Sequence, residues 1–157
     1  MDKLKLLIKT DLDEDSTLYI YAEVKIGDFL LADYGREILA IDLLQLLASL
    51  KGDGEYFVIT CGCGVPECAG VYNGILVSQE KNQVNWLLKN FQGNPNLEKT
   101  FAFDAKEYSQ TIKQGVKEFL RLYKNNPNAK TSPSLLGIDI AGSSQTEWFS
   151  NLILQGD

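Results

Sequence analysis

Two segments near the N-terminus alternate between apolar and polar residues. Lysines fall at positions 3, 5 and 9, and Leu4, Leu6 and Ile8 lie between them. From residue 18 to residue 26 every second position is apolar. A period of two is that of a half-buried strand. Because the polar residues 11–16 can turn the chain back between the two segments, we predict a β-hairpin.

The pattern changes after this hairpin. Residues 38–50 carry too many apolar side chains for one face of a surface helix, so we predict a buried helix that ends at Gly52. Three further strands, rich in β-branched and aromatic residues, are predicted at 56–61, 71–78 and 84–88. A hairpin loop at 79–83 joins the last two.

A long amphipathic helix is predicted after a short strand at 100–103. Asp104 and Glu107 have the spacing of an N-cap and its reciprocal partner. The apolar stripe that follows has steps of three and four residues and comprises Ala105, Tyr108, Ile112, Val116, Phe119, Leu120 and Tyr123. Pro127 opens a loop that ends at Pro133, and a second capping pair, Ser144 with Glu147, predicts a short helix near the C-terminus.

These elements predict one α+β domain over residues 1–157. Strands that follow one another directly, with helices between and after them, favour an antiparallel sheet. We expect two layers: a mainly antiparallel sheet of about five or six strands, covered by two long helices and the short C-terminal helix.

Composition narrows the class of protein. Apolar residues make up 45% and charged residues 23% of the chain, as in ordinary globular domains. The formal charge of −6 disfavours nucleic acid and anionic membranes as partners. No apolar run is long enough to span a bilayer and the first residues do not resemble a secretion signal, so a cytoplasmic location is expected. The chain has no histidine, which removes the commonest general base and the Ser-His and Cys-His nucleophiles.

The most unusual chemical feature is a cluster of three cysteines, Cys61, Cys63 and Cys68. Glycines at 62 and 64 and a proline at 66 allow the three thiols to converge, which suits zinc. Structural zinc takes four ligands, however, and only Glu67 or a distant carboxylate is available as the fourth. A redox role is the second interpretation, and simple packing in a tight strand connection is the third and favoured one.

Two other groups of residues each have a functional and a plainer interpretation. Asp11, Asp13 and Asp15 imitate the start of a calcium loop, but the required glycine and glutamate are missing, which favours a solvated turn. Tyr19 and Tyr21 alternate with core positions of their strand, as does Trp86 of another, so an aromatic partner surface is a possibility beside ordinary packing.

The function expected from these observations is that of a small non-enzymatic binding protein. It would act through an acidic surface or a sheet face, as inhibitor and immunity proteins do, on another protein, and a basic protein is the candidate partner. The alternative is a thiolate metal-binding or redox protein that uses the cysteine cluster. An enzyme without histidine would need a deep pocket lined by carboxylates with shifted pKa values.

Overall fold

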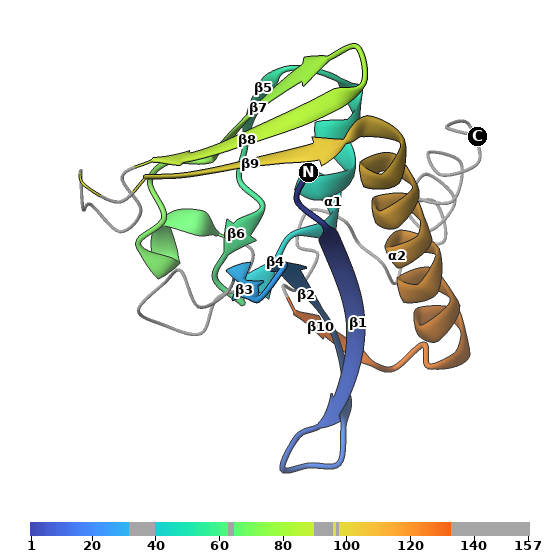
Figure 1. The fold of residues 1–157 in the computed structure, drawn as a ribbon. Helices are drawn as coiled ribbons and strands as arrows, with labels where there is room; N and C mark the ends of the chain where they lie inside the picture. Colours follow the sequence, from blue (N-terminus) through green and yellow to red (C-terminus); the bar gives the residue numbers. More distant parts are fainter. Residues whose placement is uncertain (32–39, 63–64, 90–95, 97, 133–157) are drawn as a thin grey trace.

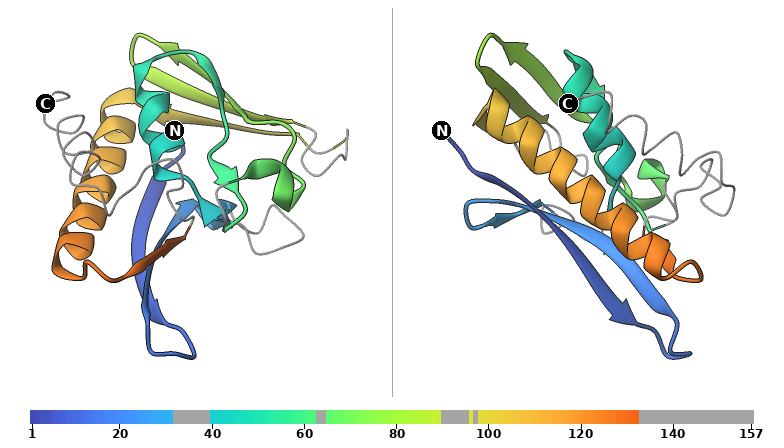
Figure 2. Two further views of the ribbon diagram at one scale, coloured as in Figure 1. Left: turned by 180° about the vertical axis from the view of Figure 1, so that it is seen from behind. Right: turned by 90° about the vertical axis from the view of Figure 1, so that its right-hand side faces the viewer.

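The computed structural model describes residues 1–31, 40–62, 65–89, 96 and 98–132. Within these residues the chain forms three sheets and two α-helices (Figure 1). The two larger sheets face a shared core, and α1 and α2 lie beside it (Figures 1 and 2). The sequence prediction for residues 133–157, including the C-terminal helix, lies outside the described residues.

The N-terminal hairpin is confirmed. Strand β1 (Leu4–Leu12) pairs antiparallel with β2 (Leu18–Ile26) in an unbroken register. At the turn the Asp13 carboxylate accepts hydrogen bonds from the amides of Asp15, at 2.9 Å, and Thr17, at 2.7 Å. The same strand β2 also pairs with β3 (Phe29–Leu30) and, in parallel, with β10 (Lys130–Ser132). The loop predicted at 127–133 therefore contains a strand that the sequence analysis missed.

The second large sheet is antiparallel and four-stranded. Its order is β5 (Gly54–Tyr56), β7 (Ile75–Glu80), β8 (Gln83–Lys89) and β9 (Glu98–Asp104). Two short strands, β4 (Ala40–Ile41) and β6 (Ile59–Thr60), form a separate ladder. The strand predicted at 56–61 is thus two strands that belong to different sheets.

The long helix is confirmed as α2 (Ala105–Asn125). Asp104 is its N-cap and accepts a hydrogen bond from the Glu107 amide at 2.9 Å. The Glu107 carboxylate forms an ion pair with Lys3 at 2.5 Å. The predicted cap therefore forms, and its partner residue also ties the helix to the start of β1.

The predicted fold class is wrong in its layering. We expected one sheet under two long helices, but the described residues form three sheets and contain one long helix. The segment predicted as a long helix at 38–50 instead contains β4, then the short α1 (Leu43–Ala48) and a 3₁₀ turn (Ser49–Lys51). Asp42 caps α1 through the amides of Leu44 and Gln45 and so prevents the helix from starting earlier. Gly52 ends the segment, as predicted, at a φ of 153° that favours glycine.

A buried network of hydrogen bonds connects α1, α2 and the second sheet. Trp86 Nε1 donates to the Tyr108 hydroxyl at 3.0 Å, and Ser49 Oγ donates to the Leu46 carbonyl at 2.5 Å. Ser49 and Tyr108 lie 2.6 Å apart, oxygen to oxygen. Because the single Ser49 proton is used on Leu46, the Tyr108 hydroxyl donates to Ser49. Trp86, Tyr108 and Ser49 thus each have a hydrogen-bond partner, as a buried polar network requires.

Helix α2 packs closely against β1 at Gly115. A Cβ at this position would lie 2.6 Å from Cγ of Leu6, closer than real contacts allow. We expect Gly115→Ala to lower the free energy of unfolding by about 1 kcal/mol, because overpacking of roughly 1–3 kcal/mol exceeds the roughly 1 kcal/mol gain in helix propensity. Urea denaturation measures this. In a Leu6→Ala background the same change should stabilise instead, and a stabilising effect in the wild-type background would contradict the close packing.

Candidate functional site

The structure describes two of the three cysteines. Cys61 directly follows β6, is half-buried and packs against the core. Cys68 lies in a 3₁₀ turn (Pro66–Ala69) and is exposed, so it does not fill interior space. Cys63 lies outside the described residues. Packing therefore accounts for Cys61 but not for Cys68.

The metal and redox interpretations of the cluster remain predictions. Among the described residues no three histidine, cysteine, aspartate or glutamate side chains are placed to hold a metal ion. That search does not include Cys63, so it does not test the full set of Cys61, Cys63 and Cys68.

A chemical measurement decides between these interpretations. The packing interpretation of the cluster requires that protein purified without chelator contain less than about 0.1 equivalent of zinc. Native Cys68 should react with a thiol reagent faster than Cys61, since reactivity requires access. Near-stoichiometric zinc, with thiols that react only after a chelator is added, would show a metal site instead.

The calcium interpretation gains no support from the geometry of the turn. The Asp13 carboxylate is already engaged by the amides of Thr17 and Asp15 and lies 3.5 Å from Lys130. The hydrogen bond from the Thr17 amide is the main cause that lowers the Asp13 pKa. Asp13 thus acts as a turn-forming residue.

The aromatic surface is not formed as suggested. Trp86 is 1% exposed and points into the core, where its ring meets those of Phe103 and Tyr108. Tyr19 and Tyr21 are half-buried on the face of β2 opposite to the core residues Ile20 and Ala22. Of the three aromatic residues suggested for a partner surface, the two tyrosines are half-buried and Trp86 belongs to the core.

The second sheet presents a different candidate surface, which we call the outer face. It is formed by the side chains that alternate with the core residues of β5, β7, β8 and β9. By register, one row across it contains Leu76, Leu87 and Thr100, and the next row contains Ser78, Asn85 and Ala102. Helices α1 and α2 lie on the opposite side of this sheet, against its core face (Figures 1 and 2).

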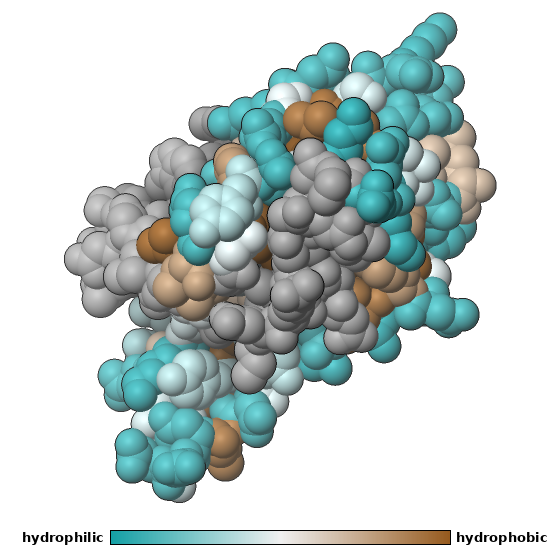
Figure 3. Space-filling view, turned by 90° about the vertical axis from the view of Figure 1, so that its left-hand side faces the viewer, coloured by the Kyte–Doolittle hydropathy of each residue, from teal (hydrophilic) through white to brown (hydrophobic). Residues whose placement is uncertain are grey.

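The centre of the outer face is apolar and hollowed. Leu76 is 42% exposed, while Leu87 and Ala102 beside it are half-buried. Together with Ser78, Thr100 and Asn85 they line a depression of about 630 Å³, so polar side chains share the hollow with the apolar ones. On the side of the molecule drawn in Figure 3, hydrophilic residues predominate among the described residues, and apolar ones form small separate patches.

Carboxylates surround this apolar centre. The side chains that the register places around it on the outer face include Glu55, Glu80 and Glu98, with Lys89 as the basic exception. Asp104 also belongs to this face by register, but its carboxylate caps α2, and the Glu55 carboxylate accepts a hydrogen bond from the Gly74 amide. Asp2 joins them at the β9 edge, where its carboxylate accepts a hydrogen bond from the Ala102 amide at 2.9 Å. The outer face therefore combines an apolar centre with a negative rim.

The sequence analysis missed the apolar centre, which becomes visible only once the strands are paired. Residues 75–80 alternate between buried and more exposed positions, which is the period-two pattern of a strand with one face in solvent. Leu76 and Leu87 occupy the solvent side of that pattern and lie directly opposite each other. Because residues 75–77 and 86–88 are runs of adjacent apolar residues, the register decides which of them face solvent, and the local sequence does not.

No family model, curated protein or solved structure matches this chain. In the part of the chain that the structure describes, no helix has the length and apolarity needed to cross a membrane.

Proposed function

We propose that this protein is a binding protein that holds a basic protein partner on the outer face of the second sheet and performs no bond-making chemistry. The observation that carries the proposal is the apolar depression around Leu76 inside a rim of carboxylates. Protein interfaces have this anatomy: an apolar centre excludes water, and a charged rim selects the partner. A partner with lysines or arginines around an apolar side chain would complement the surface.

The size of the outer face indicates the strength of such a complex. The four strands are 3, 6, 7 and 7 residues long. At about 3.3 Å per residue and about 4.8 Å between strands, they cover on the order of 350 Å². A stable interface buries roughly 800 Å² on each partner, so this face alone supports a weak, transient complex. Its negative rim should make association fast at low salt and slower as ionic strength rises.

Cross-linking in the native host tests this proposal. A photoreactive amino acid at position 87 should capture one basic polypeptide, and the same group at Leu12, which is 63% exposed at the far hairpin, should not capture it. Identical products at both positions, or capture of acidic proteins only, would refute the proposal.

The captured partner then permits a matched pair of variants. Leu76→Arg should weaken binding about tenfold, because it places a like charge against the basic partner and removes the apolar centre. Leu12→Arg changes the same residue type at an exposed site on the other sheet and should leave binding unchanged. Isothermal titration at two salt concentrations measures both effects, and equal affinities for the two variants would contradict the proposed location.

A further inference from the structure

Strand β1 has one edge without a strand partner among the described residues. It lies at the end of its sheet, next to β2 alone. Hydrogen bonds beyond both ends of the ladder show which of its residues face β2: Gly27 N donates to the Lys3 carbonyl, and Asp13 N donates to the Thr17 carbonyl. Lys3 and Asp13, which flank β1, are both odd-numbered, and the register between them is unbroken. In antiparallel pairs the direction of the backbone groups alternates, so the amides and carbonyls of Leu4, Leu6 and Ile8 face the open edge.

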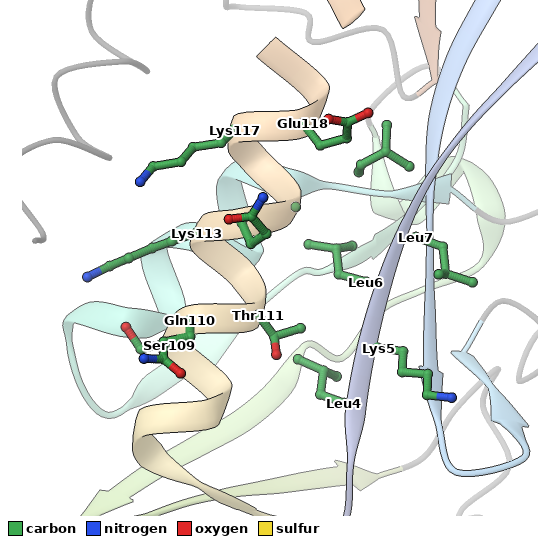
Figure 4. Close-up of a pocket in the computed structure, with 13 residues that line it drawn as sticks. Leu4, Lys5, Leu6, Leu7, Ser109, Gln110, Thr111, Lys113, Lys117 and Glu118 are labelled. Atoms are coloured by element: carbon green, nitrogen blue, oxygen red, sulfur yellow. The ribbon is translucent and has the colours of Figure 1, made fainter. Parts of the chain in front are cut away.

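A groove runs along this edge and beside α2 (Figure 4). Its volume is about 970 Å³, and it is lined by every residue from Leu4 to Ile8 and by one side of α2 from Ser109 to Glu118. Leu4 and Leu6 point from the strand toward the helix, whereas Lys5 and Leu7 point to the other side of the strand. Since successive side chains of a strand point to opposite faces, a groove lined by five successive residues follows the backbone edge itself.

The charges beside this edge are unbalanced. Lys5 lies directly opposite Lys25 of β2, and two like charges in this position destabilise a sheet. The nearest carboxylate by register, that of Glu23, is 3.0 Å from Lys9 and is engaged there. A negatively charged residue on a strand added beside β1 would lie opposite Lys5 and offset this repulsion.

We infer that the β1 edge is a second binding site, which takes up an extended segment of a partner protein by strand addition. The segment spans about five residues, or about 17 Å. Opposite Leu4 and Leu6 it carries apolar side chains that enter the groove beside α2, and opposite Lys5 it carries glutamate or aspartate. Its backbone pairs with the amides and carbonyls of Leu4, Leu6 and Ile8, which have no strand partner among the described residues. This site is separate from the outer face. It binds a negatively charged segment, whereas the outer face is proposed to bind a basic partner.

A synthetic peptide tests this inference directly. The probe is fluorescein-labelled Ser-Val-Glu-Val-Glu-Val-Ser with blocked ends, and the control replaces both glutamates with lysine. Fluorescence anisotropy should show saturable binding of the glutamate peptide and about tenfold weaker binding of the lysine peptide. Equal binding of the two peptides, or none, would overturn the inference.

Charge reversal in the protein locates the site. Lys5→Glu should lower the affinity for the glutamate peptide about fivefold and raise the affinity for the lysine peptide. A merely structural effect would not change the two affinities in opposite directions. Lys81→Glu, in the turn between β7 and β8, is the matched control and should change neither affinity. The same affinities for both variants would refute the site.

Amide hydrogen exchange shows whether the segment joins the sheet. The amides of Leu6 and Ile8 should exchange slowly only when the glutamate peptide is bound, whereas those of Lys5 and Leu7 already pair with β2 and should not change. If Leu6 and Ile8 are protected without peptide, another occupant holds the edge and the inference fails. The molecular mass from sedimentation then identifies that occupant. A monomer indicates another segment of the same chain, and a dimer indicates a second copy.

Discussion

Replacing Trp86 with alanine is expected to lower the free energy of unfolding by about 3–5 kcal/mol. The indole is 1% exposed and lies in the largest aromatic cluster of the core, with ring centroids 5.2 Å from Phe103 and 6.0 Å from Tyr108. Truncation removes these contacts, leaves a cavity between the second sheet and α2, and takes away the hydrogen bond to the Tyr108 hydroxyl. Urea denaturation followed by circular dichroism measures the loss.

The neighbouring residue provides the control for this prediction. Leu87 follows Trp86 in β8 but points to the outer face, where it is half-buried. Leu87→Ala should therefore cost less than about 1 kcal/mol, although it removes a residue of the proposed binding face. Similar losses for Trp86→Ala and Leu87→Ala would mean that the register of β8 is wrong.

Local sequence signals predicted the elements that depend on them. The hairpin of β1 and β2 follows from strict alternation on both sides of a polar turn, and α2 follows from a capping residue and a regular apolar stripe. In both cases the decisive information lies within a few residues along the chain. The side-chain cap at Asp104 and the turn at Asp13 form where the sequence placed them.

The layering of the sheets was beyond this local reasoning. An apolar segment such as 38–50 shows that its residues are buried but not what covers them, and a strand and a short helix bury the same side chains as one long helix. The separation of β5 from β6 depends on pairing with β7 and β4, which are distant in sequence. Tertiary contacts of this kind override the secondary-structure propensity of the individual segment.

The candidate surface shows the same limit. In β8, Trp86 and Leu87 are adjacent apolar residues, and alternation alone does not say which of them faces inward. Register decides it, because Trp86 lies opposite Val77 and Phe101 whereas Leu87 lies opposite Leu76 and Thr100. An aromatic residue was therefore suggested for the surface where a leucine is found.

Alkaline pH is expected to destabilise the protein through Tyr108. Burial raises the pKa of this phenol from 10.0 to about 12 in the folded state. As the pH rises, the unfolded chain loses the proton first, so the stabilisation is complete below about pH 10 and is lost between about pH 10 and pH 12. A shift of about two pKa units corresponds to a loss of about 3 kcal/mol.

A phenylalanine variant separates this effect from the other titrating groups. At pH 8 Tyr108→Phe should be about 1–3 kcal/mol less stable than the wild type, because the Trp86 donor loses its buried acceptor. Since the variant has no phenol to ionise at this site, the difference should shrink as pH rises from 10 and reach zero or reverse near pH 12. Tyr72→Phe, at a residue that is 69% exposed, should follow the wild type throughout. Urea denaturation at successive pH values measures all three proteins, and a constant difference between wild type and Tyr108→Phe would show that Tyr108 does not hold its proton in the folded core.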